Sequence, residues 1–141
     1  MKKLISALIL SLLICTSCYD DGDKPVADIK AFAFYETTDN PGIKKPDIDA
    51  KVFYYYKIYP DDFSGYIYEK DGVFIKDNLP DIKPDEEYRI GENGSVSFIP
   101  EYMNGSATIV IESKYYEGQI ASTCFSSTKN GAGFHKTFKF E

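Results

Sequence analysis

Few side chains in this sequence could perform chemistry, and their types argue against an enzyme. The 141 residues include one histidine, three cysteines and 22 acidic residues. The histidine, His135, lies beside Lys136 in a segment with a strand pattern, so we expect it to face solvent rather than act as a base. No Gly-x-Ser-x-Gly elbow, phosphate-binding loop, His-Glu-x-x-His sequence or pair of Cys-x-x-Cys motifs occurs. The sequence therefore predicts no catalytic residue, no cofactor and no enzyme activity.

Carboxylates gather in several predicted loops and leave a calcium-dependent role open as the alternative. Ca²⁺ takes about six to eight oxygen ligands, yet none of these loops has the Asp-x-Asp-x-Asp-Gly spacing of a preformed calcium site. We expect solvated charges and no metal site. The alternative is a calcium-dependent carbohydrate-binding or hydrolytic domain. It requires several carboxylates to converge within about 5 Å, drawn from Asp47, Asp49, Asp61, Asp62 and Asp85.

Tyrosine is unusually frequent, with 12 Tyr, 10 Phe and no Trp. Six tyrosines fall between residues 54 and 68, and the strand pattern at 50–59 carries aromatic side chains on both faces. Such a strand is either buried on both faces or presents tyrosine to solvent. We favour a buried central strand. Exposed tyrosines suit protein interfaces and sugar rings alike, so the candidate interaction surface comprises Tyr55, Tyr59, Tyr115 and Tyr116.

The N-terminus has the pattern of a secretory signal. Met1, Lys2 and Lys3 form a basic head, and residues 4–14 form an apolar run. As a helix this run would be about 16 Å long, too short for a hydrocarbon core of about 30 Å. A basic head, a short apolar body and a small-residue exit predict a signal peptide over residues 1–17 that is removed from the mature protein.

The exit of this signal, Cys15-Thr16-Ser17-Cys18, resembles the lipobox of bacterial lipoproteins. Cys15 stands where that family usually has Leu. The resemblance implies that Cys18 is diacylated and becomes the first residue, which would tether the protein to a membrane without a spanning segment. Residues 18–25 then form an acidic flexible tether. This tether resembles the export signal of Bacteroidota surface lipoproteins, which implies an outward-facing domain on the outer membrane; a periplasm-facing domain is the alternative.

Processing makes the chain strongly acidic. Removing residues 1–17 takes Lys2 and Lys3 from the 16 basic residues, so 14 basic residues face 22 acidic ones and the net charge is −8. Nucleic-acid affinity comes largely from phosphate neutralisation by Lys and Arg, so we expect no nucleic-acid partner. Cys124 is the one cysteine left unmodified, and its strand-like surroundings predict a buried, inert thiol.

Residues 26–141 read as strands and turns. Period-two alternation with aromatic and β-branched residues predicts strands, and Gly, Pro, Asn and Asp mark the turns between them. Asn93-Gly94 is the strongest hairpin signal, predicted to pair 88–90 with 95–99. The segment 37–49 holds two turn signals and is predicted as loop. The predicted strands are 29–35, 50–59, 64–69, 73–75, 88–90, 95–99, 106–113, 119–127 and 134–140.

This pattern predicts an all-β fold, a single antiparallel sandwich of about seven to nine strands. The run from Gly91 to Phe98, followed by Gly105 to Ile111, resembles the prealbumin-like element of extracellular bacterial domains, with 50–54 matching its opening strand. An immunoglobulin-like sandwich is the competing topology, without its Cys–Trp–Cys spacing because Trp is absent.

Together these observations predict a membrane-anchored, non-enzymatic binding or accessory module of the cell envelope. Its expected contacts are the membrane, through the N-terminal lipid, and other envelope proteins or surface glycans. The sequence names no individual ligand.

Overall fold

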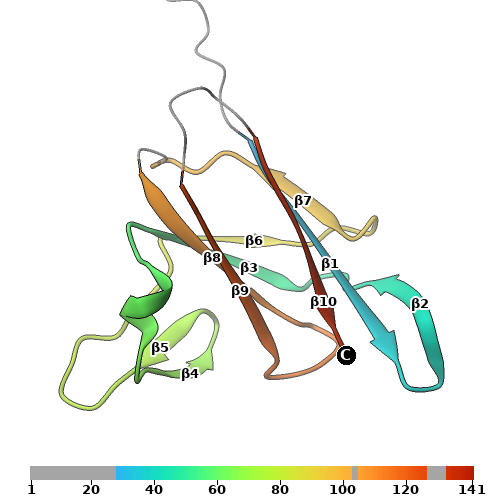
Figure 1. Cartoon of the computed structure of the whole chain (residues 1–141), viewed down its shortest axis with the longest axis horizontal. Coiled ribbons are helices and arrows are strands. Elements are labelled where there is room, and N and C mark those ends of the chain that lie inside the picture. The colour runs from blue at the N-terminus through green and yellow to red at the C-terminus, as the bar shows by residue number, and fades with distance from the viewer. Residues whose placement is uncertain (1–27, 103–104, 127–132) are drawn as a thin grey trace, which may run out of the picture.

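The computed structural model describes residues 28–102, 105–126 and 133–141, which fold into two packed β-sheets (Figure 1). The β1 sheet contains β1 (Ile29–Thr37), β2 (Asn40–Pro46), β7 (Ser95–Phe98) and β10 (Phe134–Phe140). The β3 sheet contains β3 (Lys51–Tyr56), β6 (Glu86–Arg89), β8 (Ser106–Glu112) and β9 (Ile120–Ser126). A short 3₁₀ helix, η1 (Pro60–Phe63), precedes a separate hairpin of β4 (Ile67–Lys70) and β5 (Val73–Ile75). The predicted all-β sandwich is confirmed.

The two sheets differ in the order and direction of their strands. In the β3 sheet the order is β6-β3-β8-β9, all antiparallel. In the β1 sheet, β1 pairs with β10 on one side and with both β2 and β7 on the other. The β1–β10 pair is parallel, with Ile29 opposite Phe134. This parallel pair differs from the predicted antiparallel arrangement. A parallel pair needs a long connection between its strands, and β1 and β10 are far apart in sequence.

Aliphatic and aromatic side chains from alternate strand positions fill the space between the two sheets. On β1, Ile29, Ala31 and Ala33 point inward and are at most 1% exposed. The small alanines leave room for larger partners from the facing sheet and from β10. Full burial of one such large side chain contributes about 1.5–3 kcal/mol. The larger members of this core include Val52, Tyr54, Ile109, Ile111, Phe98, Phe138 and Phe140.

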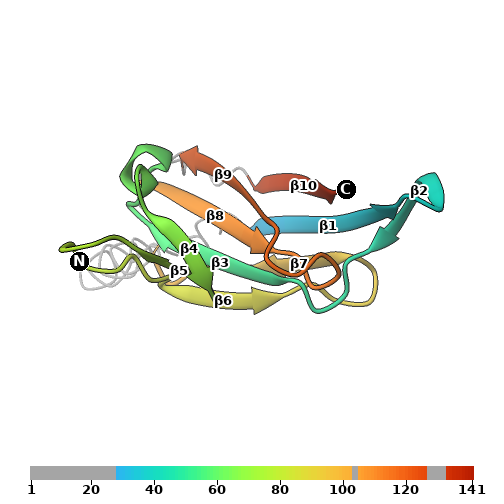
Figure 2. The ribbon, with the colours of Figure 1, turned by 90° about the horizontal axis from the view of Figure 1, so that it is seen from below.

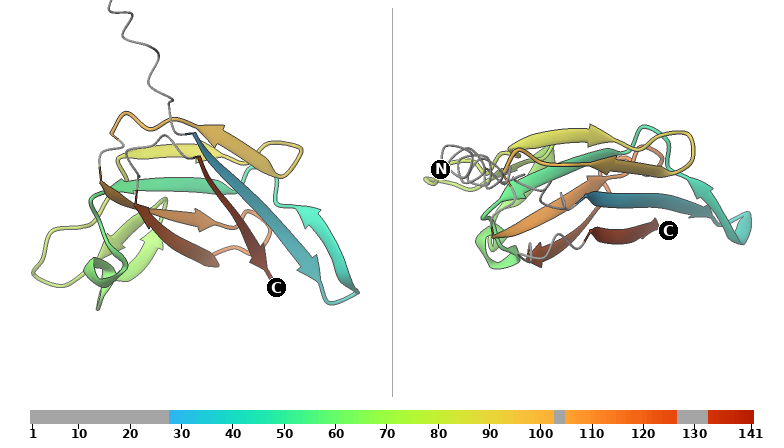
Figure 3. Two further views of the ribbon diagram at one scale, coloured as in Figure 1. Left: turned by 45° about the horizontal axis from the view of Figure 1, so that its top comes forward. Right: turned by 90° about the horizontal axis from the view of Figure 1, so that it is seen from above.

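The β3 sheet is also covered on its outer face. Phe53 and Tyr55 point away from the main core, yet both are fully buried. They pack with Val110 and Phe74 beneath the β4–β5 hairpin and η1. Figures 2 and 3 show this hairpin at one end of the molecule, with β2 at the opposite end. The prediction of a central strand buried on both faces is confirmed for β3, and we call the packed set of Phe53, Tyr55, Phe74, Val110, Phe63 and Tyr68 the hairpin core.

The Asn93-Gly94 turn has a different role from the one predicted. Its backbone forms a tight turn, with Gly91 N donating to Ser95 O at 3.0 Å and Gly94 N to Gly91 O at 2.9 Å. The strands it joins lie in different sheets, because β6 pairs with β3 while β7 pairs with β1. The hairpin prediction is therefore wrong: the turn carries the chain from one layer to the other. Gly94 has φ +76°, and a Cβ there would lie 2.8 Å from the Phe34 ring.

The segment predicted as loop between residues 37 and 49 contains the edge strand β2. It pairs antiparallel with the end of β1, where Tyr35 lies opposite Lys45. Its residues are almost all exposed, so no hydrophobic alternation reveals it in the sequence. The prolines in β2 are compatible with an edge position, where an unpaired backbone nitrogen costs little.

Candidate functional site

The four predicted surface tyrosines do not form one surface. Tyr55 is 0% exposed, so its assignment to an interaction surface is wrong: the hairpin and η1 cover that face of β3. Tyr59 is 50% exposed and lies just before η1. Tyr115 is 51% exposed, and Tyr116 beside it is partly buried in the β8–β9 turn. Cys18 and the segments 1–17 and 18–25 lie outside the described residues.

Tyr115 and Tyr116 belong to a compact aromatic group with Tyr35 at the end of β1. The rings of Tyr35 and Tyr115 stack with centroids 3.8 Å apart and planes 9° apart. The Tyr116 ring meets Tyr115 edge-on at 4.9 Å, and its hydroxyl donates to the Glu36 carbonyl oxygen at 2.5 Å. Stacked and edge-on contacts of this kind are favourable and directional. We call Tyr35, Tyr115 and Tyr116 the tyrosine platform.

Asp47 fixes the turn that carries the platform. Its side chain is 1% exposed. The carboxylate accepts from Ser113 Oγ at 2.6 Å, Lys114 N at 3.2 Å and Tyr115 N at 3.0 Å. Ser113 Oγ in turn accepts from Tyr116 N at 2.9 Å. A buried carboxylate is tolerated because these donors replace its water, and it holds the β8–β9 turn against the loop that precedes β3. In the sequence Asp47 was one of several loop acids, and nothing there distinguished it.

A polar cavity of about 320 Å³ opens beside Tyr115. Its walls come from the start of β3, the ends of β6 and β8, and the β8–β9 turn. Side chains of both charges and one aromatic ring face it: Asp49, Lys51, Arg89, Glu112, Ser113, Lys114, Tyr115 and Glu117. Cavities of this size accommodate small ligands. The cavity and the platform meet at Tyr115, and together they form the candidate binding site.

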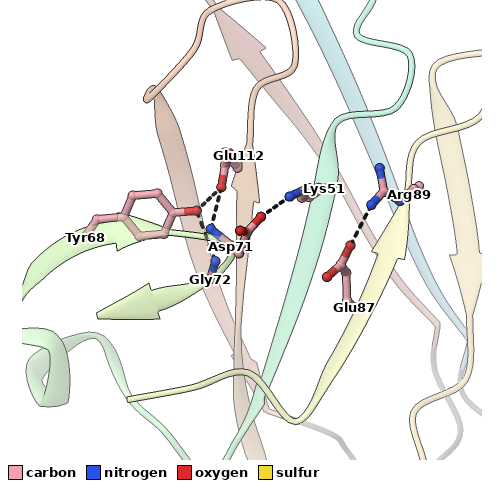
Figure 4. A network of polar contacts seen from close by, with 7 residues as sticks. All are labelled: Lys51, Tyr68, Asp71, Gly72, Glu87, Arg89 and Glu112. Carbon is pink, nitrogen blue, oxygen red and sulfur yellow. Dashed lines mark hydrogen bonds and ion pairs between the residues drawn. The ribbon is translucent and has the colours of Figure 1, made fainter. Parts of the chain in front are cut away.

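Three of the cavity's charged residues lie in one row across the β3 sheet. Arg89 is opposite Lys51, which is opposite Glu112. Two adjacent cations repel each other, and neighbouring acids offset this cost. Lys51 pairs with Asp71 at the tip of the hairpin, and Arg89 pairs with Glu87 at 3.1 Å (Figure 4). The hydrogen bond between Lys51 and Asp71 raises the pKa of Lys51 and lowers the pKa of Asp71.

Glu112 connects the same row to the hairpin. Its carboxylate accepts from the Tyr68 hydroxyl and, at 3.1 Å, from Asp71 N (Figure 4). The Tyr68 hydroxyl oxygen accepts from Gly72 N at 3.1 Å. Burial raises the pKa of Tyr68, and the bond to Glu112 adds to this. These bonds hold the hairpin tip over the β3 sheet, next to Lys51 and Glu112, which line the cavity.

The predicted loop carboxylates do not come together in the described residues. Asp47 is bound to the β8–β9 turn, Asp62 accepts from Tyr59 N at 2.7 Å, and Asp85 accepts from Tyr56 N at 2.7 Å. Across residues 28–102, 105–126 and 133–141, no three His, Cys, Asp or Glu side chains are grouped so that they could hold a metal ion. The convergence that the calcium-dependent alternative requires is thus not found there.

Cys124 and His135 both lie on the surface. Cys124 is a free, exposed thiol, so the prediction that it is buried is wrong. β9 is the outer strand of its sheet, and its inward positions are taken by Ala121, Thr123 and Phe125, which leaves Cys124 facing solvent. His135 on β10 is exposed, as predicted, and it lies opposite Lys30 on β1.

Comparison with known proteins gives no relative from which a role could be transferred. No protein-family model matches the chain, and no curated protein or solved structure matches it significantly. Within the described ranges, none of the helical segments has the length and apolar character needed to cross a membrane. The function of this protein is therefore inferred from its sequence motifs and from the site itself.

Proposed function

We propose that this protein is a lipid-anchored, non-enzymatic binding or accessory module of the cell envelope. The observation that carries the proposal is the sequence of the N-terminus, where a basic and apolar signal ends in the lipobox-like Cys15-Thr16-Ser17-Cys18. Acylated Cys18 would hold the domain at the outer membrane. One acyl chain binds a membrane only marginally, and two or more give stable anchoring.

The acidic tether places the domain on the outer side of that membrane in this proposal. Residues 19–25 contain three aspartates, a glycine and a proline, and resemble the export signal of Bacteroidota surface lipoproteins. In this proposal the segment serves as a solvated tether, since an acidic chain with Gly and Pro has little apolar surface to bury. The sandwich would therefore sit close to the cell surface, with freedom to orient its binding site.

The site at the β8–β9 turn supports a binding role. Tyr115 is half exposed, yet its ring is held by stacking on Tyr35 and its backbone by Asp47. A preformed contact residue loses little conformational freedom on binding. The proposal assigns no reaction to the site. Its one serine, Ser113, is buried, and its hydroxyl is bonded to Asp47, whose carboxylate also accepts from two backbone nitrogens and holds the turn.

The test of the proposal is the intact mass and location of the full chain in its host. Wild-type protein is expected in the membrane fraction. Its mass should match a chain that starts at Cys18 and carries acyl groups. Cys18→Ala should lose the acyl mass and, unlike the wild-type protein, should be released from the membrane fraction by an alkaline carbonate wash. Cys15→Ala is the matched control and should keep both the acyl mass and the membrane attachment, since Cys15 is removed with the signal.

Protease treatment of intact cells then tests the outward orientation. Digestion of the wild-type protein supports the surface-exposed domain, whereas protection until the outer membrane is opened indicates a periplasm-facing one. A wild-type protein that is unprocessed or free of lipid contradicts the anchoring proposal.

A further inference from the structure

The charged groups around the cavity divide into two sets. Lys51, Arg89 and Glu112 are already engaged with Asp71, Glu87 and Tyr68. Asp49, Lys114 and Glu117 are exposed, and within the described chain their side chains make no ion pair or hydrogen bond. Two acceptors and one strong donor are thus available to a ligand next to the Tyr115 ring.

Because both signs line the cavity, a ligand with a single net charge fits it poorly. A cationic ligand would meet Lys114 and the two cations of the β3 sheet, and an anionic ligand would meet Asp49 and Glu117. Placing a like charge beside these groups costs binding free energy. A neutral ligand rich in hydroxyl groups avoids both penalties, since each hydroxyl donates to a carboxylate and accepts from an ammonium group.

The tyrosine ring adds a requirement for a flat apolar face. One face of Tyr115 rests on Tyr35, with the ring centroids 3.8 Å apart, so a ligand that stacks on Tyr115 must use the opposite face. A phenol ring combines an apolar face with a polar edge. The C–H groups on one side of a pyranose ring provide a matching apolar face, while its hydroxyls point outward toward the cavity wall.

We propose that this cavity binds a neutral sugar unit of a glycan, with the sugar ring stacked on Tyr115 and its hydroxyls bound by Asp49, Lys114 and Glu117. The inference rests on the proposed binding function and gives its ligand class. It requires no metal ion, which distinguishes it from the calcium-dependent alternative. A cavity of about 320 Å³ lies at the lower end of the range typical of ligand sites and suits one or two sugar rings.

Saturation-transfer NMR tests this proposal directly. The full chain, purified in a detergent without a sugar head group, is irradiated at its tyrosine ring protons in the presence of one probe at a time. The neutral probes are maltose, cellobiose, lactose and N,N′-diacetylchitobiose, and the charged ones are agmatine and glucuronate. We expect saturation of ring C–H protons in at least one neutral disaccharide, in the presence of a calcium chelator, and none in the charged probes.

Two tyrosine variants, one in the site and one outside it, test which ring binds the sugar. Tyr115→Ala should reduce affinity for the bound disaccharide by about tenfold or more, which corresponds to about 1.4 kcal/mol. Tyr102→Ala removes a ring of similar exposure, 54%, that also stacks on another tyrosine, Tyr56, but precedes β8 instead of following it. It should leave binding unchanged. Glu117→Gln should weaken binding several-fold without removing it.

Several outcomes would overturn the proposal: no saturation in any neutral disaccharide, saturation only in a charged probe, or equal losses in the two tyrosine variants. The anchoring experiment is independent of these. An unlipidated protein that binds sugar would overturn the anchor alone, and a lipidated protein that binds none of these sugars would overturn the sugar site alone.

Discussion

The hairpin core and the tyrosine platform use the same residue type for opposite purposes. In the hairpin core, Tyr55 is fully buried and meets Phe63 and Phe74 edge-on at 5.3 and 6.1 Å. Its hydroxyl donates to the Gly72 carbonyl oxygen. On the platform, Tyr115 is equally well packed on one side but 51% exposed overall. Tight packing is therefore common to both regions and does not explain their difference in exposure.

The difference between the two regions is what covers them. Residues 57–85 supply η1 and the β4–β5 hairpin, which close over the outer face of β3. The β8–β9 turn has no equivalent cover among the described segments, and Asp47 holds it from below. A tyrosine that is rigid and covered contributes to stability, whereas one that is rigid and open is prepared for a partner.

The largest effect is expected at alkaline pH, where the covered tyrosines resist ionisation. Burial raises the pKa of Tyr54 to about 12, and it also raises the pKa values of Tyr55, Tyr68 and Tyr88. Unfolded tyrosine ionises near pH 10. Their contribution to stability is therefore complete below about pH 10 and is lost as pH rises through the folded pKa values.

We expect cooperative alkaline unfolding, accompanied by a late step of tyrosinate absorbance. The measurement is a parallel pH titration of ultraviolet absorbance and near-ultraviolet circular dichroism. Complete tyrosine ionisation while the tertiary signal persists would show that these hydroxyls are accessible. It would contradict the burial of Tyr55 and Tyr68 in the hairpin core and of Tyr54 in the core between the sheets.

The next effect comes from removing a ring from each region. Phe74→Ala deletes a side chain that is 7% exposed and contacts Phe63 and Tyr68 with ring centroids at 4.5 and 5.0 Å. It should lower the free energy of unfolding by about 3–5 kcal/mol. Tyr115→Ala should lower it by about 1 kcal/mol or less. The measurement is urea unfolding of both variants. Similar losses in the free energy of unfolding would contradict the distinction between the two regions.

Asp47→Ala should have an intermediate effect, because it removes the support beneath the platform. The substitution leaves three donors without their acceptor, and hydrogen bonds to charged groups contribute about 1.5–3 kcal/mol each. Neighbouring contributions are not additive, and water can replace the acceptor at the exposed residues Lys114 and Tyr115, so we expect a loss below the sum, about 2–4 kcal/mol in unfolding free energy. Amide hydrogen exchange at Lys114 and Tyr115 should also accelerate. Unchanged exchange rates there would show that the turn is held by other contacts.

The smallest effect is expected at the hairpin tip. The bond to Lys51 lowers the pKa of Asp71, so this pair stabilises the fold above the ordinary aspartate pKa of about 3.9 and is lost as pH falls through the lowered value. Because Asp71 is exposed and the pair is screened by salt, Asp71→Asn should change stability only slightly at neutral pH. A large change in the urea midpoint would indicate that the hairpin depends on this contact rather than on its aromatic core.

Local patterns predicted most of the strands, but they did not predict which strands pair. The aromatic residues on both faces of β3 identified a strand buried on both sides. The Asn93-Gly94 turn was recognised, yet its two strands enter opposite sheets, because pairing depends on contacts far apart in sequence. The exposed edge strand β2 has no hydrophobic alternation, so the sequence gives no sign of it.

The candidate site was predicted only in part, for a similar reason. Tyr115 and Tyr116 were identified because they are tyrosines. Tyr55 was wrongly assigned to the surface, because the hairpin that covers it comes from a segment later in the sequence. Asp47 was named only as a candidate calcium ligand, and Tyr35 was not named as a site residue. Asp47 reaches the β8–β9 turn across more than sixty residues, and such a contact leaves no local pattern.

The most direct test of the account is whether the open platform, and not the anchor alone, binds the envelope. The measurement is co-sedimentation of full-length Cys18→Ala protein, which lacks the lipid, with washed envelopes of the host. We predict measurable binding that is lost when Tyr115→Ala is added and retained when Tyr102→Ala is added. Equal binding by the two double variants, or no binding by the unanchored chain, would contradict the proposal that the β8–β9 turn carries the function of this protein.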